Sequence, residues 1–221
     1  MPHQNTVFRQ LTNGLPWGLL DRLIDETGAD ARVRRLGTKD MLLALLFAQV
    51  SGARSLRDIE AILASQAARC YHSGLRPVHR STLADAAMSR PVKVFTELLS
   101  MMMAGMARKL RRDLADCVRL IDSTTLPLNR LSGDWSRFSA HLCGAKAHVI
   151  YDPDADCPLY LGITPARVND ITAAKAMPIE PGATYVFDLG YYDYGWWAKL
   201  DDAQCRLVTR LKCNTPLTLI E

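Results

Sequence analysis

The chain has 221 residues, of which 48% are apolar, and a formal net charge of +4. This composition excludes a globally disordered chain, and the length suits one large domain or two small ones. The longest apolar run, residues 41–50, is too short to span a bilayer, and the polar first residues show no secretory signal. The sequence therefore predicts a cytoplasmic protein that does not enter a membrane.

The basic residues are concentrated in the first half of the chain. Residues 1–113 contain 17 Lys and Arg against 10 Asp and Glu, a net of +7, whereas residues 114–221 contain 10 against 13, a net of −3. A basic N-terminal half favours a polyanionic partner such as DNA, and an acidic second half favours a metal-binding core. Ordinary charged helix faces would give the same totals, so charge alone leaves both interpretations open.

The N-terminal half has the pattern of a helical domain. Capping residues followed by apolar residues at three- and four-residue steps predict four helices, which begin at Thr38, Ser55, Thr82 and Pro91. Thr38 is expected to be an N-cap, and so is Ser55, which has Asp58 three residues later. A loop over residues 71–79 separates the second of these helices from the third.

The pattern changes near residue 114, where short apolar runs bounded by turn residues begin. These runs predict strands at 117–122, 145–151, 158–164, 184–188 and 206–211, with helices at 171–177 and 192–203. Asn169 and Asp170 are expected only to introduce the first of those helices. The order β-β-β-α-β-α-β predicts an α+β fold, in which a helical N-terminal domain precedes a mixed sheet with helices on its faces.

Asp122 and Asp188 are the strongest candidates for a catalytic and metal-binding site. Each follows an apolar strand and is expected to stand at its C-terminal end, so neighbouring strands would bring the two carboxylates together. Paired carboxylates repel one another unless a cation neutralises them, and Mg²⁺, with Mn²⁺ as a substitute, prefers such oxygen ligands. The alternative is that each Asp only caps the turn that follows it.

Lys146 and His148 are candidates for a supporting role. They lie two residues apart on a predicted strand and therefore share one face of the sheet. If that face looks onto the site, Lys146 would meet a phosphate and His148 would polarise a water or a scissile oxygen. The alternative is a pair that faces outward at a sheet edge.

A third cluster lies at the start of the helix predicted from Thr82. Arg76, His79, Arg80, Ser81 and Thr82 combine basic and hydroxyl side chains of the kind that contact DNA phosphates and grooves. The preceding helix, glycine-containing turn and helix are similar to a helix-turn-helix arrangement. A solvated, capped helix without DNA is the alternative.

These motifs together resemble bacterial insertion-sequence transposases of the IS4 type. The resemblance rests on Ile121-Asp122-Ser123-Thr124, Gly144-Ala145-Lys146-Ala147-His148, the segment 164–170 and Phe187-Asp188-Leu189-Gly190-Tyr191. The segment from Pro2 to Leu56 is similar to a helical domain that precedes the catalytic core in one branch of this group. The resemblance covers essentially all of the chain.

The resemblance implies a helical, DNA-binding domain at 1–113 and an RNase H-like catalytic core at 114–221. It implies a DDE triad with Asp122 as the first acid and Asp188 as the second, which would bind two Mg²⁺ ions for DNA cleavage and strand transfer. The expected third acid is a Glu within a Tyr-Arg-Glu signature, and the sequence has none: Glu221 is the only acid after Asp202. We therefore expect a truncated copy of the core.

The expected partner of such a protein is double-stranded DNA at the terminal inverted repeats of the element. The resemblance further implies a homodimer on that DNA and a bacterial, nucleoid-associated location. Two alternatives remain open from the sequence. One is a nuclease with the same core but no strand transfer, and the other is a catalytically inactive DNA-binding fragment that inhibits transposition.

Overall fold

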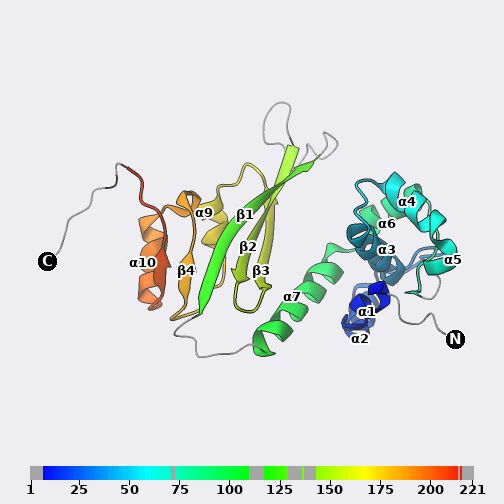
Figure 1. The fold of residues 1–221 in the computed structure, drawn as a ribbon, viewed down its shortest axis with the longest axis horizontal. Helices are drawn as coiled ribbons and strands as arrows, with labels where there is room; N and C mark the ends of the chain where they lie inside the picture. The colour runs from blue at the N-terminus through cyan, green and yellow to red at the C-terminus, as the bar shows by residue number, and fades with distance from the viewer. Residues whose placement is uncertain are drawn as a thin grey trace. The chain divides into compact units, whose positions relative to one another are not determined.

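The computed structural model describes residues 7–70, 73–109, 117–128, 136, 143–213 and 215. The chain divides into two compact units, residues 1–102 and 103–221. The first is helical and the second carries a sheet (Figure 1). The domain boundary that the sequence predicts at 113/114 falls within 110–116, outside the described residues, and stays a prediction. Within the described ranges no helix is long and apolar enough to cross a membrane.

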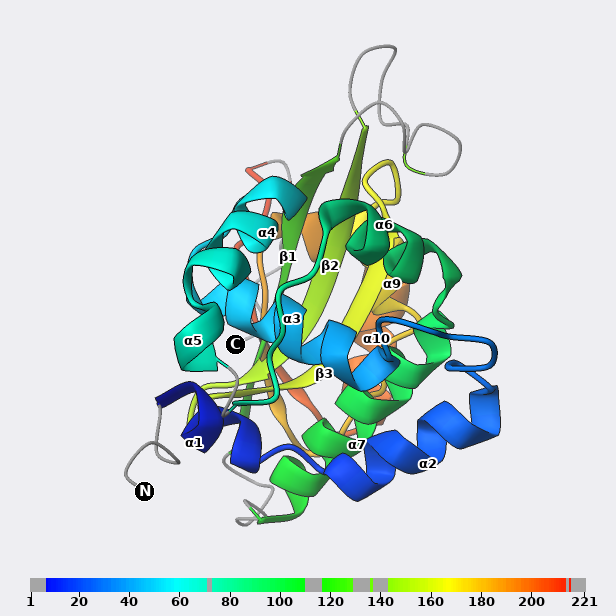
Figure 2. The same cartoon turned by 90° about the vertical axis from the view of Figure 1, so that its right-hand side faces the viewer.

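The helical unit is built from short helices, as the sequence predicts. Its elements are α1 (Val7–Asn13), α2 (Trp17–Thr27), α3 (Thr38–Val50), α4 (Leu56–Ser65), α5 (Ala67–Cys70), α6 (Arg80–Ser89) and α7 (Val92–Lys109), whose last residues belong to the second unit. Two apolar clusters form its core. One joins α3, α4 and α6 through residues such as Leu43, Leu63 and Leu83, and the other joins α2 to α7 (Figure 2).

One of the predicted helix caps is confirmed and two are wrong. The Ser55 hydroxyl accepts a hydrogen bond from the Asp58 N–H at 3.1 Å, as a capping box requires. Thr38 is instead the first residue of α3, because its N–H and hydroxyl both donate to the Asp30 carboxylate. In α6 the cap is His79, whose ring nitrogen accepts from the Ser81 N–H, so the helix begins two residues before Thr82.

The second unit confirms the α+β class and the predicted element order. Its elements are β1 (Val118–Leu128), β2 (Cys143–Asp152), β3 (Cys157–Pro165), α9 (Asp170–Ala174), β4 (Thr184–Val186), the 3₁₀ helix η4 (Leu189–Tyr191), α10 (Tyr194–Asp202) and β5 (Arg206–Val208). The strands form one mixed sheet in the order β3-β2-β1-β4-β5. β1, β2 and β3 pair antiparallel, whereas β4 is parallel to β1 and to β5. This arrangement is consistent with an RNase H-like fold.

The bounds of β1 and β4 correct the predicted position of the two acids. β1 runs six residues past Asp122, because Ser123 to Leu128 continue the antiparallel ladder with β2. Adjacent β-branched Thr124 and Thr125 favour that continuation, and Pro127 is tolerated near the end of the strand. Asp122 therefore lies in mid-strand. β4 in turn ends at Val186, two residues before Asp188.

The two faces of the sheet differ. One face is buried beneath α9, η4 and α10, where Ile121 and Ile150 pack with Tyr191, Trp196 and other apolar residues. Strand alternation places Leu120, Asp122 and Ile163 on the opposite face, and Ile163 is 61% exposed there. The sheet itself thus separates the first acid from the packed core.

Candidate active site

Asp122 lies on β1, and Asp188 lies two residues beyond the end of its parallel neighbour β4. Leu120 of β1 is paired with Val186 of β4 in parallel register, and each acid follows its paired residue by two positions. Both residues are exposed. The predicted adjacency of the two acid-bearing strands is therefore confirmed, although β1 carries Asp122 in its middle.

Each carboxylate uses one oxygen for a local hydrogen bond. Asp122 Oδ1 accepts from the Ser123 N–H at 2.7 Å, and Asp188 Oδ1 accepts from the Gly190 N–H at 2.8 Å. Asp188 thus makes the turn contact with Gly190 that the sequence left as the alternative, whereas no turn follows Asp122, because β1 continues to Leu128. Neither second oxygen has a hydrogen bond to the described residues.

These two carboxylates have the right chemistry for a divalent cation. Exposed carboxylate oxygens without a competing partner are the ligands that Mg²⁺ and Mn²⁺ prefer. The rest of a complete site is not present in the described part of the chain, where no three or more His, Cys, Asp or Glu residues are grouped to hold a metal. The pair therefore fits a metal as two ligands of a larger set.

A polar network lies on the face of the sheet that α9 covers. Its centre is Asp170, whose Oδ1 accepts hydrogen bonds from Lys146 Nζ at 2.9 Å and from Ser123 Oγ at 2.8 Å. Ser123 is the direct neighbour of Asp122, and the alternation of β1 points the two side chains to opposite faces. The network thus joins the residue after the first acid to β2 and α9.

Lys146 and His148 do share a face, but not at an edge. β2 lies between β1 and β3, so the edge alternative is wrong. His148 is fully buried and its Nε2 pairs with Thr164 Oγ1 at 2.8 Å. Its Nδ1 stands 3.8 Å from Asp170 Oδ1. Burial lowers the pKa of His148 despite the Asp170 charge. His148 is therefore a neutral part of the network and does not reach the surface itself.

Asp170 is the residue that the sequence interpretation missed. It was expected only to introduce a helix, yet Asn169 occupies the cap position of α9 without a side-chain hydrogen bond, and the Asp170 carboxylate turns inward. Burial raises the pKa of this carboxyl, but hydrogen bonds from Lys146 and Ser123 outweigh it and hold the pKa below its ordinary value. Asp170 is therefore ionised.

Gly190 connects this network to the second acid. A Cβ on Gly190 would lie 3.0 Å from Asp188 Oδ1 and 3.2 Å from Asp170 Oδ2. Both carboxylates therefore border the space that a side chain at this position would fill. The next residue, Tyr191, is buried, and its phenol pKa is raised, first by burial and then by Asp170, Asp122 and Asp188. The negative charges of all three carboxylates therefore raise the pKa of the same buried phenol.

Comparisons with known proteins agree with this geometry. Residues 113–219 match the model of the transposase DDE domain, and residues 3–76 match a domain of unknown function, DUF4372. A presumed transposase of Sinorhizobium fredii, y4zB, is 45% identical over 148 residues, which are 67% of this chain and 41% of that protein. Residues 113–219 belong to the transposase DDE domain family.

A second relative in this family is more distant. The presumed transposase of insertion sequence element IS5377 of Geobacillus stearothermophilus is 30% identical over 87 residues, 38% of this chain and 23% of that protein. The chain thus spans less than half the length of either transposase. The matched DDE domain contains Asp122, Asp188 and the whole Asp170 network.

In the helical unit the predicted DNA-binding residues do not form one cluster. His79 Nε2 and Arg80 Nη1 lie 3.3 and 3.9 Å from the Glu60 carboxylate, so both face an acid on α4. Thr82 instead lines one pocket beside the α2–α3 loop, and Arg76 lines a second pocket there. Ser81 is exposed and bonded to His79.

Proposed function

We propose that this chain acts in the cleavage and joining of DNA at the ends of an insertion sequence, with Asp122 and Asp188 as metal ligands. The observation that carries the proposal is the parallel pairing of β1 and β4, in which each acid follows the last paired residue of its segment by two positions. Both acids are exposed, and each has an oxygen not used in local bonding. Assignment to a DDE transposase domain supports the same pair.

The two acids have a direct role in this proposal. A bound Mg²⁺ or Mn²⁺ would stabilise charge on the attacking and leaving oxygens at phosphorus. Asp122 and Asp188 would supply anionic oxygen ligands and fix the place of the reaction at the open face of the sheet.

Lys146, His148 and Asp170 act indirectly. Asp170 accepts from the Ser123 hydroxyl, and Lys146 and His148 lie against Asp170. The Ser123 N–H in turn donates to Asp122, and the Gly190 N–H donates to Asp188. We therefore assign them to positioning, and not to contact with phosphate.

The proposed partner is double-stranded DNA that carries the terminal inverted repeats of the element. Residues 1–113, which include the helical unit, carry a net charge of +7, and this basic charge supports the assignment. Assembly as a homodimer on two such ends and a place at the bacterial nucleoid belong to the same proposal.

Binding to element ends tests the function. The purified chain is titrated with a duplex that contains a terminal repeat and with a shuffled duplex of equal composition. A transposase is expected to bind the repeat at least about tenfold more tightly at ~150 mM salt, because specific DNA-binding proteins exceed their non-specific affinity by far more than that. Equal affinity for both duplexes would favour the nuclease alternative.

A further inference from the structure

The loop between α2 and α3, residues 28–37, borders an open pocket of about 540 Å³ in the helical unit. Arg32, Arg34 and Arg35 line it from the loop and are all exposed. None of the three forms an ion pair within the part of the chain that the structure describes. Thr82 and Ser89 of α6 line the pocket as well. We call these five residues and Arg90 the arginine pocket.

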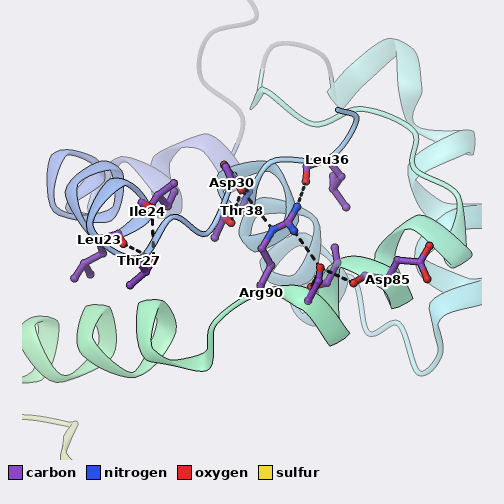
Figure 3. Close-up of polar contacts among 10 residues, drawn as sticks. Leu23, Ile24, Thr27, Asp30, Leu36, Thr38, Asp85 and Arg90 are labelled. Carbon is purple, nitrogen blue, oxygen red and sulfur yellow. Dashed lines mark hydrogen bonds and ion pairs between the residues drawn. The ribbon is translucent and has the colours of Figure 1, made fainter. Parts of the chain in front are cut away.

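The loop that carries these arginines is held by an ion pair between Asp30 and Arg90 (Figure 3). Asp30 accepts hydrogen bonds from the N–H and the hydroxyl of Thr38, at 2.8 and 2.7 Å, at the start of α3. Arg90 Nε lies 3.4 Å from Asp30 Oδ1, and Arg90 Nη2 donates to the Leu36 carbonyl oxygen. The Arg90 side chain is only 8% exposed. The loop is therefore fixed to α3 and to the end of α6.

The backbone of the loop is strained at one of the arginines. Arg32 has a φ of 64°, in the left-handed region where glycine is favoured and a long side chain is not. Such conformations persist where the surroundings impose them, and they gather at binding sites. Arg32 lies in the loop that the Asp30 and Arg90 contacts fix, and it lines the pocket.

The charge of the pocket selects an anion. Arg32, Arg34 and Arg35 stand against one lining carboxylate, that of Asp85, whereas Arg90 already pairs with Asp30. Two hydroxyl groups, of Thr82 and Ser89, add neutral hydrogen-bonding capacity. Several guanidinium groups around one open pocket suit phosphate oxygens, which accept their paired N–H groups.

We propose that the arginine pocket binds backbone phosphates of duplex DNA. This inference rests on the proposed function and specifies where the helical unit holds its DNA. The sequence predicts the DNA contact at His79 and Arg80, but these residues face Glu60. We place the contact at the α2–α3 loop instead. Arg76 stays in the contact, because it lines a smaller pocket together with Arg35.

The test compares two triple variants of the full chain that lose the same charge. The first is Arg32→Gln, Arg34→Gln and Arg35→Gln. The control is Arg22→Gln, Arg54→Gln and Arg57→Gln, which do not line the pocket. Binding to a fluorescent duplex is measured by anisotropy between ~50 and ~300 mM salt, and circular dichroism verifies that both variants fold.

Removal of arginines that neutralise phosphates has a distinct signature in salt. The slope of log affinity against log salt should become shallower by about 0.9 for each phosphate that the pocket variant no longer neutralises, with at least about tenfold weaker binding at ~100 mM salt. The control should keep the wild-type slope. Equal slopes for the wild type and the pocket variant would overturn the proposal, and so would an equal weakening of binding in the two variants.

A single substitution separates binding from folding. Arg32→Gly relieves the left-handed backbone and removes one cation, so the chain should melt at the same or a higher temperature while its salt slope falls by about 0.9. An unchanged slope would overturn the role of Arg32.

The failure of this inference can be distinguished from the failure of the active-site proposal. If the wild type binds no duplex, the inference is overturned. If only the active-site proposal fails, Asp122 and Asp188 do not bind a metal, whereas the chain still binds DNA.

Discussion

Lys146 and Asp170 form a half-buried ion pair at 2.9 Å, directly behind the strand that carries Asp122. The same Asp170 oxygen accepts from Ser123, the residue next to that acid. Asp170→Asn should therefore destabilise the chain by about 1–3 kcal/mol, because it leaves the Lys146 ammonium without its counter-charge. Urea denaturation checks this value. Asp154→Asn, an exposed change in the β2–β3 turn, is the control and should cost less than about 0.5 kcal/mol.

His148 makes the stability of the chain depend on pH. Burial lowers its folded-state pKa below the unfolded value of about 6.5, so the neutral form is favoured in the fold. The stability it contributes is complete above pH ~6.5 and is lost as the pH falls toward the folded pKa. The melting temperature should fall between pH 7 and pH 5. His148→Gln should flatten that part of the curve, and an equally steep curve in this variant would exclude His148 as the cause.

Arg119 is a buried residue of β1 that pairs with two acids. Its Nη1 and Nε bond Asp152 at 2.9 Å and Glu180 at 2.8 Å, and its side chain is 6% exposed. Arg119→Met should cost about 3–5 kcal/mol, since it leaves the Asp152 carboxylate buried and unpaired. Lys39→Met breaks an exposed pair with Asp21 and should cost less than about 1 kcal/mol by the same denaturation experiment.

Gly190 should tolerate no side chain. Gly190→Ala would place a methyl group 3.0 Å from Asp188 Oδ1 and 3.2 Å from Asp170 Oδ2, closer than Cβ contacts ordinarily come. Displacement of either carboxylate should weaken Mn²⁺ binding while the chain stays folded. Gly105→Ala, where a Cβ would meet nothing within 4 Å, is the control. Unchanged Mn²⁺ affinity in Gly190→Ala would show that the backbone there does not position Asp188.

Much of the architecture could be predicted from local patterns. Ser55 and Pro91 mark helix starts correctly, and the apolar runs give all five strands in order, because capping and periodicity are local properties. The bounds of β1 could not be predicted, since Ser123 to Leu128 become a strand only through pairing with β2. Thr38 likewise owes its place to Asp30, eight residues earlier.

The candidate site was predictable only in part. Asp122 and Asp188 could be found because each follows an apolar strand. Asp170 could not, since Asn-Asp before a helix is the ordinary signature of a cap, and only the fold brings Lys146 and Ser123 to its carboxylate. The Arg32–Arg35 run was visible in the sequence, yet nothing local shows that Asp30 and Arg90 fix it beside a pocket.

Titration of the chain with Mn²⁺, followed by electron paramagnetic resonance, tests the pairing of Asp122 and Asp188 most directly. Asp122→Asn and Asp188→Asn should each weaken Mn²⁺ binding at least about tenfold, because each removes one of two anionic ligands. Asp202→Asn, an exposed change at the end of α10, should leave the affinity unchanged. Weaker binding in all three variants alike, or in neither of the first two, would contradict a shared metal site at these strands.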